Sequence, residues 1–375
     1  MAEQELEVQK FLRILPKLQV LAEKYGIEHT FSDCGELVIL NYSQIDSPKT
    51  ERIVQECRGL TLQVGTWDVV ARAFPRFFNL GENLEQTQAF DWSNFTCQSK
   101  EDGSLILLYQ YKGNWKINTR GSFGQGEVNR SGYTWANLFE QALSQAKLYE
   151  LWTRGILNGK YTYVFEMATP FNRIVTPYEG INLFLLTVVN NKTGAELSSE
   201  RVYDIAAHMG VKLPQTYTLR SLEEIEKLIA AQPDTFEGVV LRDQNGVRLK
   251  VKSARYLALH RMHGNGNICL AKNLVPLALS NEGDEWLTYF PDAKPYYLAV
   301  KAKLETELEN LLTVYGEAAR IESQKDFANY VLPRTKLSSI LFQARKTGKP
   351  VREIWNVSAD LLTKVLFKES LDVTA

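Results

Sequence analysis

Short runs of hydrophobic residues recur through the first two thirds of the chain and predict β-strands. Runs of this kind lie at 105–111, 115–120, 161–165, 183–189, 236–241 and 247–251. Lys112-Gly113-Asn114 joins the first two, and the last two flank Asn245-Gly246, a dipeptide typical of tight hairpin turns. These two pairs of runs therefore predict two β-hairpins.

Apolar residues follow helical spacing at 5–24, 133–151 and 222–231, and Ser221 with Glu224 forms a candidate capping box before the last of these. Beyond residue 253 the strand pattern fades. Helical spacing then appears at 301–320, 325–331, 337–345 and 359–367. We therefore expect an α+β protein, in which a body of antiparallel sheets with helices (residues 1–253) precedes an all-helical domain (residues 254–375).

The composition is that of an ordinary folded protein, because 45% of the 375 residues are hydrophobic and the length suits two domains with cores of their own. The chain has no run of about 18 apolar residues, and its acidic start lacks an apolar stretch. We therefore expect neither a transmembrane helix nor a secretory signal. The four cysteines are far apart, which favours neither a disulfide framework nor a zinc site and suits a reducing cytoplasm.

The formal net charge of −1 argues against a nucleic-acid partner only until it is divided along the chain. Residues 1–253 carry a net charge of −3, and residues 254–375 carry +2. Within the second part, the segment 334–368 carries +6, from Arg334, Lys336, Arg345, Lys346, Lys349, Arg352, Lys364 and Lys368 against Glu353 and Asp360. Such a run is either a solvated helix face or a surface that meets phosphates, and the pattern alone favours neither.

Lys100-Glu101-Asp102-Gly103-Ser104 stands at a predicted turn directly before the apolar strand at 105–111. A lysine can act as a covalent nucleophile if it loses its proton, and a free lysine has a pKa near 10.4. Neighbouring positive charge or removal from water lowers that pKa. Lys250 and Lys252 alternate along one predicted strand, so they share a face and are candidate neighbours. A polar surface turn is the plain alternative for this segment taken alone.

Several further motifs follow Lys100 in order along the chain. They are Phe165-Glu166, Asn172-Arg173-Ile174-Val175, the strand at 183–189, Glu237-Gly238-Val239-Val240 and Leu249-Lys250-Val251-Lys252-Ser253. This ordered series resembles the nucleotidyltransferase motifs of covalent ATP-dependent ligases and mRNA-capping enzymes. The resemblance implies a nucleotidyltransferase fold with ATP-grasp-like antiparallel sheets.

The finer likeness is to tRNA-repair RNA ligases of the T-even phage RNA ligase 1 type. It rests on Glu56-Cys57-Arg58-Gly59, Phe77-Phe78-Asn79-Leu80, the Lys100 segment, 169–175, 191–194 and Lys252-Ser253 with Tyr256, Leu259 and His260. It continues at 284–289 and at Tyr296-Tyr297, whereas the region past 300 is similar only in helical character. DNA ligases and capping enzymes place an OB-type β-barrel after the last lysine motif, and the predicted helices speak against one.

The resemblance implies three chemical steps. Lys100 attacks the α-phosphate of ATP, pyrophosphate leaves, and a lysyl-AMP forms. The AMP passes to the 5′-phosphate of an RNA end, and a 3′-hydroxyl then displaces AMP and seals the strand. It implies that Lys100, Glu166 and Lys252 are catalytic, that ATP is a substrate, and that Mg²⁺ or Mn²⁺ assists by neutralising phosphate charge.

The resemblance also implies which side chains contact ATP and metal. The ATP-contacting set is Arg58, Arg76, Phe78, Lys100, Glu101, Arg120, Glu166, Glu237, Lys250, Lys252 and Tyr256. The metal set is Glu237 and Asp284, and few carboxylates suffice because Mg²⁺ keeps waters and phosphate ligands. Packing is the plain alternative for Phe78 and Tyr256, a strand edge for Arg120, and a helix-start acid for Asp284.

Four positions depart from the family pattern, and one of them is Glu285, which replaces a second aspartate next to Asp284. Arg76 and Arg120 stand where the family has lysine, which keeps the charge but changes the hydrogen-bond geometry. Leu40 stands where the family has a tyrosine that contacts the nucleotide, and Tyr42 is the alternative for that contact.

RNA with 5′-phosphate and 3′-hydroxyl ends is the expected partner, and the helical domain is the expected place of RNA recognition, including recognition of cleaved tRNA. We expect a monomer without membrane contact, in the cytoplasm of a bacterium or a virus-infected cell. Two other functions stay open at this point. One is a related nucleotidyltransferase, either a capping guanylyltransferase or a DNA ligase, and the other is a catalytically silent RNA-binding protein of the same fold.

Overall fold

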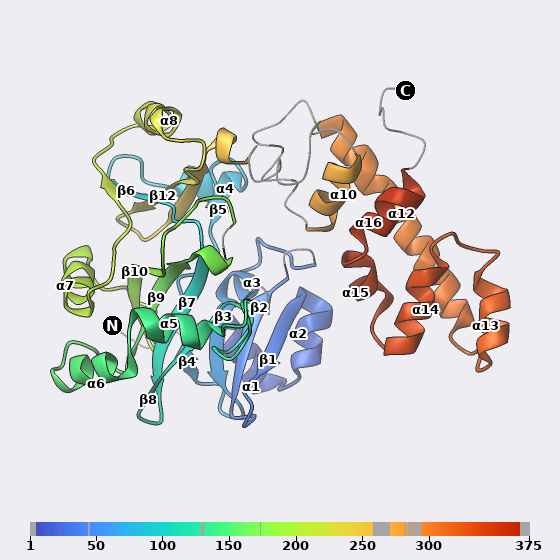
Figure 1. Ribbon diagram of the computed structural model, residues 1–375, viewed down its shortest axis with the longest axis horizontal. Helices are drawn as coiled ribbons and strands as arrows, with labels where there is room; N and C mark the ends of the chain where they lie inside the picture. The colour runs from blue at the N-terminus through green and yellow to red at the C-terminus, as the bar shows by residue number, and fades with distance from the viewer. Residues whose placement is uncertain are drawn as a thin grey trace. The chain divides into compact units, whose positions relative to one another are not determined.

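The computed structural model describes residues 5–43, 46–128, 131–172, 174–257, 271–280, 283, 287 and 294–367. The chain divides into two compact units, residues 1–260 and 261–375 (Figure 1). The first unit contains three sheets with helices and the described part of the second contains helices, which confirms the predicted α+β class with a helical C-terminal region. The first unit continues past 253, because Tyr256 is buried and its hydroxyl donates a hydrogen bond to Asp102.

The first sheet is antiparallel with the strand order β1-β2-β3-β4. Its strands are β1 (Ile27–Phe31), β2 (Leu37–Tyr42), β3 (Arg58–Gln63) and β4 (Val69–Ala71). The helices around the same core are α1 (Glu7–Ile14), α2 (Leu18–Tyr25) and α3 (Arg52–Glu56). The helical pattern at 5–24 is thus two helices, and Pro16 lies at the break because proline has no N–H to continue the first helix.

The second sheet is antiparallel with the strand order β10-β9-β7-β8, and its four strands all coincide with predicted ones. They are β7 (Ser104–Tyr111), β8 (Asn114–Asn118), β9 (Tyr161–Ala168) and β10 (Asn182–Asn190). Three helices share a core with this sheet, namely α5 (Trp135–Ala142), α6 (Gln145–Thr153) and α7 (Ser199–Met209). The pattern at 133–151 is also two helices, since Leu143 is extended and the Ser144 side chain caps the start of α6.

The third sheet has the order β11-β6-β12-β13-β5. Its strands are β5 (Phe78–Asn79), β6 (Phe95–Ser99), β11 (Thr216–Tyr217), β12 (Gly238–Asp243) and β13 (Arg248–Lys252). The predicted hairpin of β12 and β13 is present, and α8 (Leu222–Ala231) packs Ile225 into the core of this sheet. The Ser221 hydroxyl accepts a hydrogen bond from the N–H of Glu224, but the Glu224 carboxylate accepts from Arg220, so half of the expected capping box forms.

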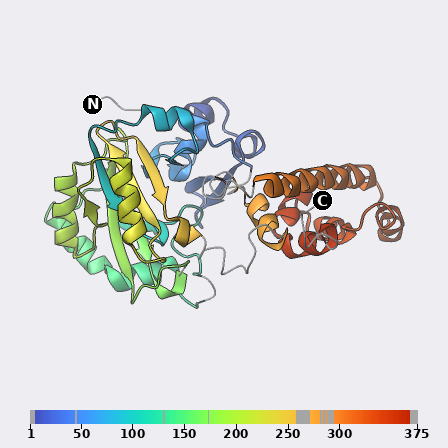
Figure 2. The same ribbon diagram turned by 90° about the horizontal axis from the view of Figure 1, so that it is seen from above.

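Among its described residues, the helical unit contains the predicted helical segments and two more helices, α10 (Ala271–Leu279) and α15 (Val351–Asn356). Its other helices are α12 (Lys294–Ala318), α13 (Gln324–Val331), α14 (Ser338–Thr347) and α16 (Ala359–Leu366). Together these helices enclose a core that includes Leu308, Leu341 and Trp355, and α12, drawn in orange in Figure 2, is the longest of them. In the described part of the chain, every helix is too short or too polar to cross a membrane.

Candidate active site

Lys100 follows β6 directly and is fixed beside the start of β12. Its backbone N–H donates a hydrogen bond of 2.9 Å to the carbonyl oxygen of Gly238. Its Nζ lies 2.7 Å from Oε1 of Glu237, and the Nζ of Lys252 lies 3.4 Å from the same oxygen. The Glu237 side chain is only 6% exposed, so one buried carboxylate oxygen holds two ammonium groups. The fold therefore brings together three residues that are far apart in the sequence.

Lys250 lies two residues before Lys252 on β13, and both side chains are half-buried. Its ammonium lies 5.3 Å from the centroid of the Phe77 ring. The backbone of Lys250 pairs with Asn79 of β5, so β13 connects the Lys252 end of the site to the segment that follows Phe77. The structure thus gives the two lysines different neighbours.

Glu166 lies on β9, where its partners across the sheet are Leu105 of β7 and Phe184 of β10. Burial raises the pKa of Glu166 to about 7, with Lys100 and Arg58 acting in the opposite direction and Glu237 adding to the rise. A carboxyl group that titrates near neutral pH can take or give a proton at physiological pH. Glu166 is therefore a candidate for proton exchange next to Lys100.

Phe184 is a candidate site residue that the sequence pattern did not suggest. As the cross-strand partner of Glu166, it stands on the same face of the second sheet. Its ring is largely buried, the Lys212 ammonium lies 5.8 Å from the ring centroid, and the Tyr178 ring meets it edge-on. An aromatic ring at this position can stack on the base of a nucleotide whose phosphates reach Lys100. The register between 161–165 and 183–189 would have revealed it.

Asp102 ties the Lys100 loop to two other segments. Its Oδ2 accepts hydrogen bonds from the backbone N–H groups of Val175 (2.9 Å) and Thr176 (2.8 Å). Its Oδ1 accepts one of 2.9 Å from the hydroxyl of Tyr256. Burial raises the pKa of the Tyr256 hydroxyl, so this group stays protonated and remains a donor. Tyr256 thus positions the loop through Asp102.

Glu101 belongs to the same loop and is held on both oxygens. The hydroxyl of Ser99 donates to its Oε1 at 2.5 Å, and the hydroxyl of Tyr178 donates to its Oε2 at 3.0 Å. Tyr178 in turn accepts a hydrogen bond from the N–H of Asp102. The structure therefore places Glu101 in the network that supports Lys100.

Two glycines of the motifs are required by the close approach of backbone segments. A Cβ atom on Gly103 would lie 2.5 Å from the carbonyl oxygen of Met167 in β9. A Cβ atom on Gly238 would lie 2.2 Å from the carbonyl oxygen of Val251, and Gly238 has a φ of +141°. Any side chain at either position would push apart the strands that carry Lys100, Glu166 and Lys252.

Arg58, at the start of β3, is packed against aromatic rings. Its guanidinium carbon lies 4.7 Å from the centroid of Phe74, and that of Arg248 lies 4.5 Å from the same ring. Burial lowers the pKa of Arg58 to about 10. Its Nη1 is buried and makes no hydrogen bond to any described residue. A buried donor without an acceptor costs about 1–3 kcal/mol, a cost that an incoming anion removes.

Arg76 is a second buried cation in this region. Its Nη2 lies 2.6 Å from Oε1 of Glu82, and its guanidinium carbon lies 4.2 Å from the centroid of Phe78. The Phe78 ring is buried and packs against the Arg76 guanidinium. The Nη1 of Arg76 is buried and finds no acceptor among the described residues, which leaves a second donor for an anion.

Tyr42, the alternative to Leu40 for contact with the nucleotide, is buried and lies beside two arginines. Leu40 is fully buried in the core of the first sheet. The guanidinium carbon of Arg120 lies 5.1 Å from the Tyr42 ring centroid, and that of Arg76 lies 5.9 Å away. Burial acts to raise the pKa of the Tyr42 hydroxyl, but the positive charges around it outweigh burial and lower that pKa.

Of the two residues expected to hold a metal, the structure describes Glu237 but not Asp284. Glu237 contacts the Nζ of Lys100, and its negative charge adds to the rise in the pKa of Glu166. One or two carboxylates together with substrate phosphates are what Mg²⁺ uses, and these two side chains fit that requirement. Within the described ranges, no group of three His, Cys, Asp or Glu side chains is placed to hold a metal ion by itself.

Comparison with known proteins decides the family. The sequence profile of a family described as RNA ligase matches residues 56–256, which is more than half of the chain. The chain belongs to the RNA ligase family. The matched stretch begins just before Arg58 and ends at Tyr256, so it includes Lys100, Glu166 and Glu237. The predicted likeness to the phage RNA ligase 1 type is thereby confirmed.

Two sequence relatives carry RNA ligase in their names, and one solved structure is similar in part. A protein of Autographa californica nuclear polyhedrosis virus, named as a bifunctional polynucleotide kinase/RNA ligase, is 34% identical over 73% of this chain, and this chain spans 40% of the viral protein. The RNA ligase of Rhodothermus phage RM378 is 26% identical over 72% of this chain and 74% of its own length. An archaeal ATP-dependent RNA ligase superposes on 87% of this chain and 89% of its own, with 13% identity and a TM-score of 0.47.

Proposed function

We propose that this protein seals RNA with ATP, through a covalent lysyl-AMP on Lys100. The observation that supports the proposal most directly is the pairing of the Lys100 Nζ with Glu237, which a second lysine, Lys252, also contacts. In a family of RNA ligases, a lysine whose Nζ contacts a carboxylate that can accept its proton, next to a second cation, is placed to become the nucleophile.

The first step forms one bond and breaks one bond. The Nζ of Lys100 gives up a proton and attacks the α-phosphorus of ATP, and the bond to pyrophosphate breaks. Glu237, in contact with Nζ, and Glu166, which titrates near pH 7, are the carboxylates beside that proton. In the second step the 5′-phosphate of RNA takes the AMP from Lys100. In the third step an RNA 3′-hydroxyl displaces AMP and joins the strands.

The anionic phosphates require a cationic surface, and the arginines supply one. Arg58 and Arg76 each keep a buried Nη1 without an acceptor among the described residues, and Arg120 lies beside the Tyr42 ring. Donors that are already desolvated and fixed bind phosphate oxygens without further reorganisation. A bound Mg²⁺ or Mn²⁺, held by Glu166 and Glu237, would supply further neutralisation of phosphate charge.

The test is the transfer of label from ATP to the full-length protein. Protein is incubated with ATP or GTP labelled at the α-phosphate in the presence of Mg²⁺, denatured, and exposed to acid. We expect label from ATP that survives denaturation, is released by acid as a phosphoramidate should be, and is absent in Lys100→Arg, which keeps the charge beside Glu237. Lys192→Ala, which removes an exposed lysine of the same unit, is the control.

The other functions give different results in this assay. Labelling by GTP alone would favour a capping enzyme, and no labelling with either nucleotide would favour a silent RNA-binding protein. Adding 5′-phosphorylated RNA or DNA to the labelled protein then identifies the polymer. If DNA were sealed as readily as RNA, the RNA specificity would be wrong.

We further propose that the helical unit binds RNA, including broken tRNA. The cations of its basic segment have different uses. Arg345 donates hydrogen bonds to the carbonyl oxygens of Ile321 and Glu322, and Lys349 pairs with Glu353. Arg345 thus connects α14 to the loop between α12 and α13 and supports the fold of the unit. The exposed lysines that remain are the better candidates for RNA contact, namely Lys336, Lys346 and Lys364.

The remaining parts of the proposal concern the cellular compartment and the oligomeric state. The thiols of Cys34, Cys57 and Cys97 are free, which supports a reducing cytoplasm. We propose that the protein acts there as a monomer. Sedimentation of the full-length chain at several concentrations tests the monomer.

A further inference from the structure

Two exposed aromatic side chains, Tyr133 and Phe171, contact each other outside the set of residues described above. Their ring centroids are 4.9 Å apart, with an angle of 50° between the rings, although the residues lie far apart in the sequence. Each is 38% exposed, so the pair is packed on one side and open to solvent on the other. Large apolar groups at the surface are informative when they gather, because a gathered pair marks a binding surface more often than a single residue does.

The pair is connected to the Lys100 loop through Asn172. Phe171 lies in the short 3₁₀-helix Pro170–Asn172, and the Asn172 side chain donates hydrogen bonds to the hydroxyl of Ser104 (3.0 Å) and to the carbonyl oxygen of Met167 (3.1 Å). Ser104 is the last residue of the Lys100 segment. Hydrogen bonds therefore connect the segment that carries Phe171 to the segment that carries Lys100, so the fold fixes the position of the pair relative to Lys100.

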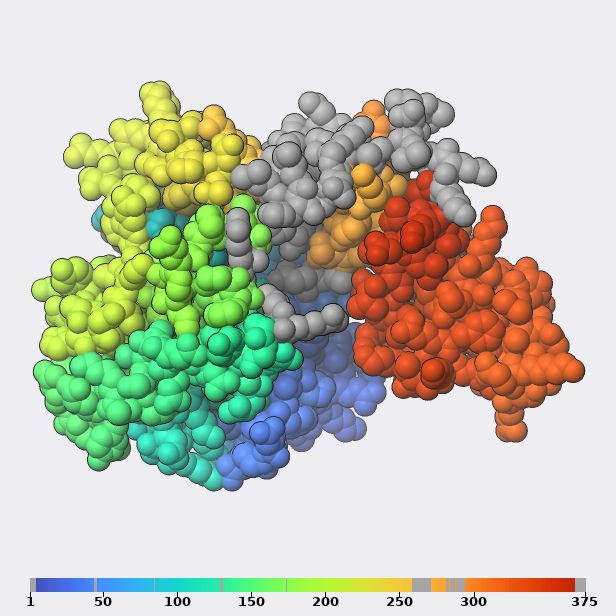
Figure 3. Space-filling view, in the orientation of Figure 1, coloured from blue at the N-terminus to red at the C-terminus, as the bar shows by residue number. Residues whose placement is uncertain are grey.

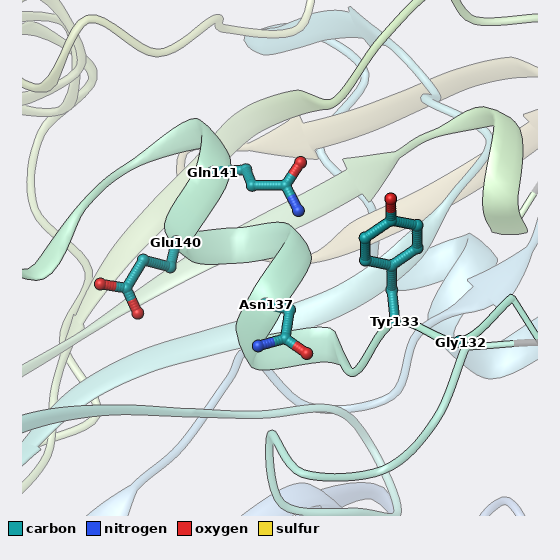
Figure 4. A pocket seen from close by; sticks show the side chains of 5 residues that line it. All are labelled: Gly132, Tyr133, Asn137, Glu140 and Gln141. Carbon is teal, nitrogen blue, oxygen red and sulfur yellow. The ribbon is translucent and has the colours of Figure 1, made fainter.

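A pocket opens beside Tyr133, as Figure 4 shows. Its walls are Gly132, Tyr133, Asn137, Glu140 and Gln141, of which the last three belong to α5. In Figure 4 the Gln141 amide points toward the Tyr133 ring, whereas the Glu140 carboxylate points away from it. The first turn of α5 is capped, since the Thr134 hydroxyl accepts a hydrogen bond from the N–H of Asn137, so this wall is fixed. Figure 3 shows the surface of α5 on the face turned to the viewer.

We propose that the Tyr133–Phe171 pair and this pocket bind an unstacked nucleobase of single-stranded RNA next to the end being joined. Proteins that read single-stranded RNA stack its bases on aromatic rings and bind the base edges with amide and carboxylate groups. The pair supplies the ring surface, and the Gln141 amide supplies a donor and an acceptor at its side. The inference rests on the proposed RNA-sealing function and deepens it, because it gives the catalytic unit an RNA contact of its own.

The experiment separates this site from the chemistry at Lys100. The full-length protein is first charged with labelled AMP, and its transfer of AMP to a 5′-phosphorylated oligoribonucleotide is followed in a single turnover at increasing RNA concentration. The variants are Tyr133→Ala and Phe171→Ala, with Tyr133→Trp as the conservative replacement. Tyr149→Ala is the matched control, because Tyr149 is an exposed tyrosine of α6 that also meets an aromatic ring, Trp152.

We expect both alanine variants to form lysyl-AMP at the wild-type rate and to bind RNA roughly 5- to 150-fold more weakly, which corresponds to the 1–3 kcal/mol of one base stack. Tyr133→Trp should restore binding, and Tyr149→Ala should behave as wild type. The contacted base is identified with a set of RNAs, each of which lacks one base near the 5′-phosphate. One of these RNAs should bind the wild-type protein more weakly than the complete RNA does. The same RNA should bind Tyr133→Ala as well as the complete RNA does.

Three outcomes would overturn the inference. The first is normal RNA binding by both alanine variants. The second is an equal loss of lysyl-AMP formation and of AMP transfer, which would show that the pair only supports the fold. The third is a Tyr133→Ala variant as sensitive as wild type to every missing base, which would assign the surface to another partner, such as a protein. A failure to form lysyl-AMP in the wild-type protein would instead refute the proposed function itself.

Discussion

Replacing Glu82 with glutamine tests whether Arg76 is held in place for the phosphates of ATP. Glu82 accepts three hydrogen bonds, from Nη2 of Arg76 (2.6 Å), from the N–H of Asn79 (2.8 Å) and from the Asn79 amide (2.6 Å). Burial acts to raise the pKa of Glu82, but the positive charges of Arg76 and Lys250 outweigh it and lower that pKa. Glutamine keeps the shape of the side chain and removes the charge.

The loss is large because both partners of the ion pair are buried. The side chains of Arg76 and Glu82 are 8% and 11% exposed. Breaking a buried pair by removing one charge costs about 3–5 kcal/mol, and because glutamine retains hydrogen-bonding capacity we expect about 3 kcal/mol. In a unit of this size that loss lowers the melting temperature by about 6–12 °C. We also expect kcat/KM for lysyl-AMP formation to fall roughly tenfold, because a charged hydrogen bond that positions Arg76 is worth about 1.5 kcal/mol.

Thermal unfolding and the initial rate of labelling by ATP measure the two effects. Glu85→Gln is the matched control, because Glu85 is an exposed glutamate three residues away in α4 (Leu84–Ala89), and we expect neither quantity to change. The pH supplies a second check. A depressed carboxyl pKa contributes stability above its unfolded value near 4.3 and loses it as the pH falls through the folded value, so the gap between wild type and Glu82→Gln should close in acid. Equal melting temperatures for Glu82→Gln and the control Glu85→Gln at pH 7 would refute the reasoning.

Three further changes have definite expected results. Gly238→Ala should cost about 3 kcal/mol or more, because its Cβ would lie 2.2 Å from a carbonyl oxygen at a φ of +141°. Glu166→Gln should be more stable than wild type at pH 8 by up to about 3 kcal/mol and no different at pH 4, since a carboxyl pKa raised from 4.3 to about 7 contributes stability that is lost as the pH rises through 7. The third change neutralises three exposed lysines of the helical unit, Lys336, Lys346 and Lys364. It should weaken RNA sealing more than lysyl-AMP formation. It should also reduce the slope of the logarithm of the RNA-binding constant against the logarithm of salt concentration by about 2.

Each of these has a matched comparison. Gly121 has open space around it, so Gly121→Ala should change stability by no more than about 0.5 kcal/mol in the urea titration used for Gly238→Ala. Glu226→Gln, at an exposed position of α8, should show no pH-dependent gain beside Glu166→Gln. For the lysines, equal losses in RNA sealing and in lysyl-AMP formation would contradict a role in RNA contact.

Most of the strands near Lys100 could be predicted because their hydrophobic pattern is local, whereas β6 (Phe95–Ser99), which Lys100 directly follows, was not predicted. β7, β9, β10, β12 and β13 are all apolar runs bounded by turn residues, and each appears within a few residues of its expected place. The helix breaks were harder to predict, because a periodic pattern continues across them. Pro16 interrupts the first pattern, and Ser144, through its capping side chain, starts a new helix within the second.

The partners of the site residues could not be predicted because they depend on register and on contacts between distant segments. Phe184 becomes a site residue only once β10 is aligned with β9 opposite Glu166. Arg76 was assigned to phosphate from its position in a motif, but the sequence does not show that Glu82 holds it. Asp102 likewise reads as a turn residue, whereas the structure gives it the hydroxyl of Tyr256 and the backbone of 175–176.

The charge distribution of the catalytic unit shows why net charge does not predict whether a protein binds an anionic substrate. Residues 1–253 carry a net charge of −3, yet Arg58 and Arg76 are buried beside aromatic rings and keep unmatched donors among the described residues. Many of the acids that outnumber them are exposed, where water and salt screen their charge. A charge in a desolvated pocket acts through a lower effective dielectric constant and therefore weighs more in binding than a charge at the surface. A near-zero net charge is thus compatible with an enzyme that gathers a triphosphate and an RNA end around one lysine.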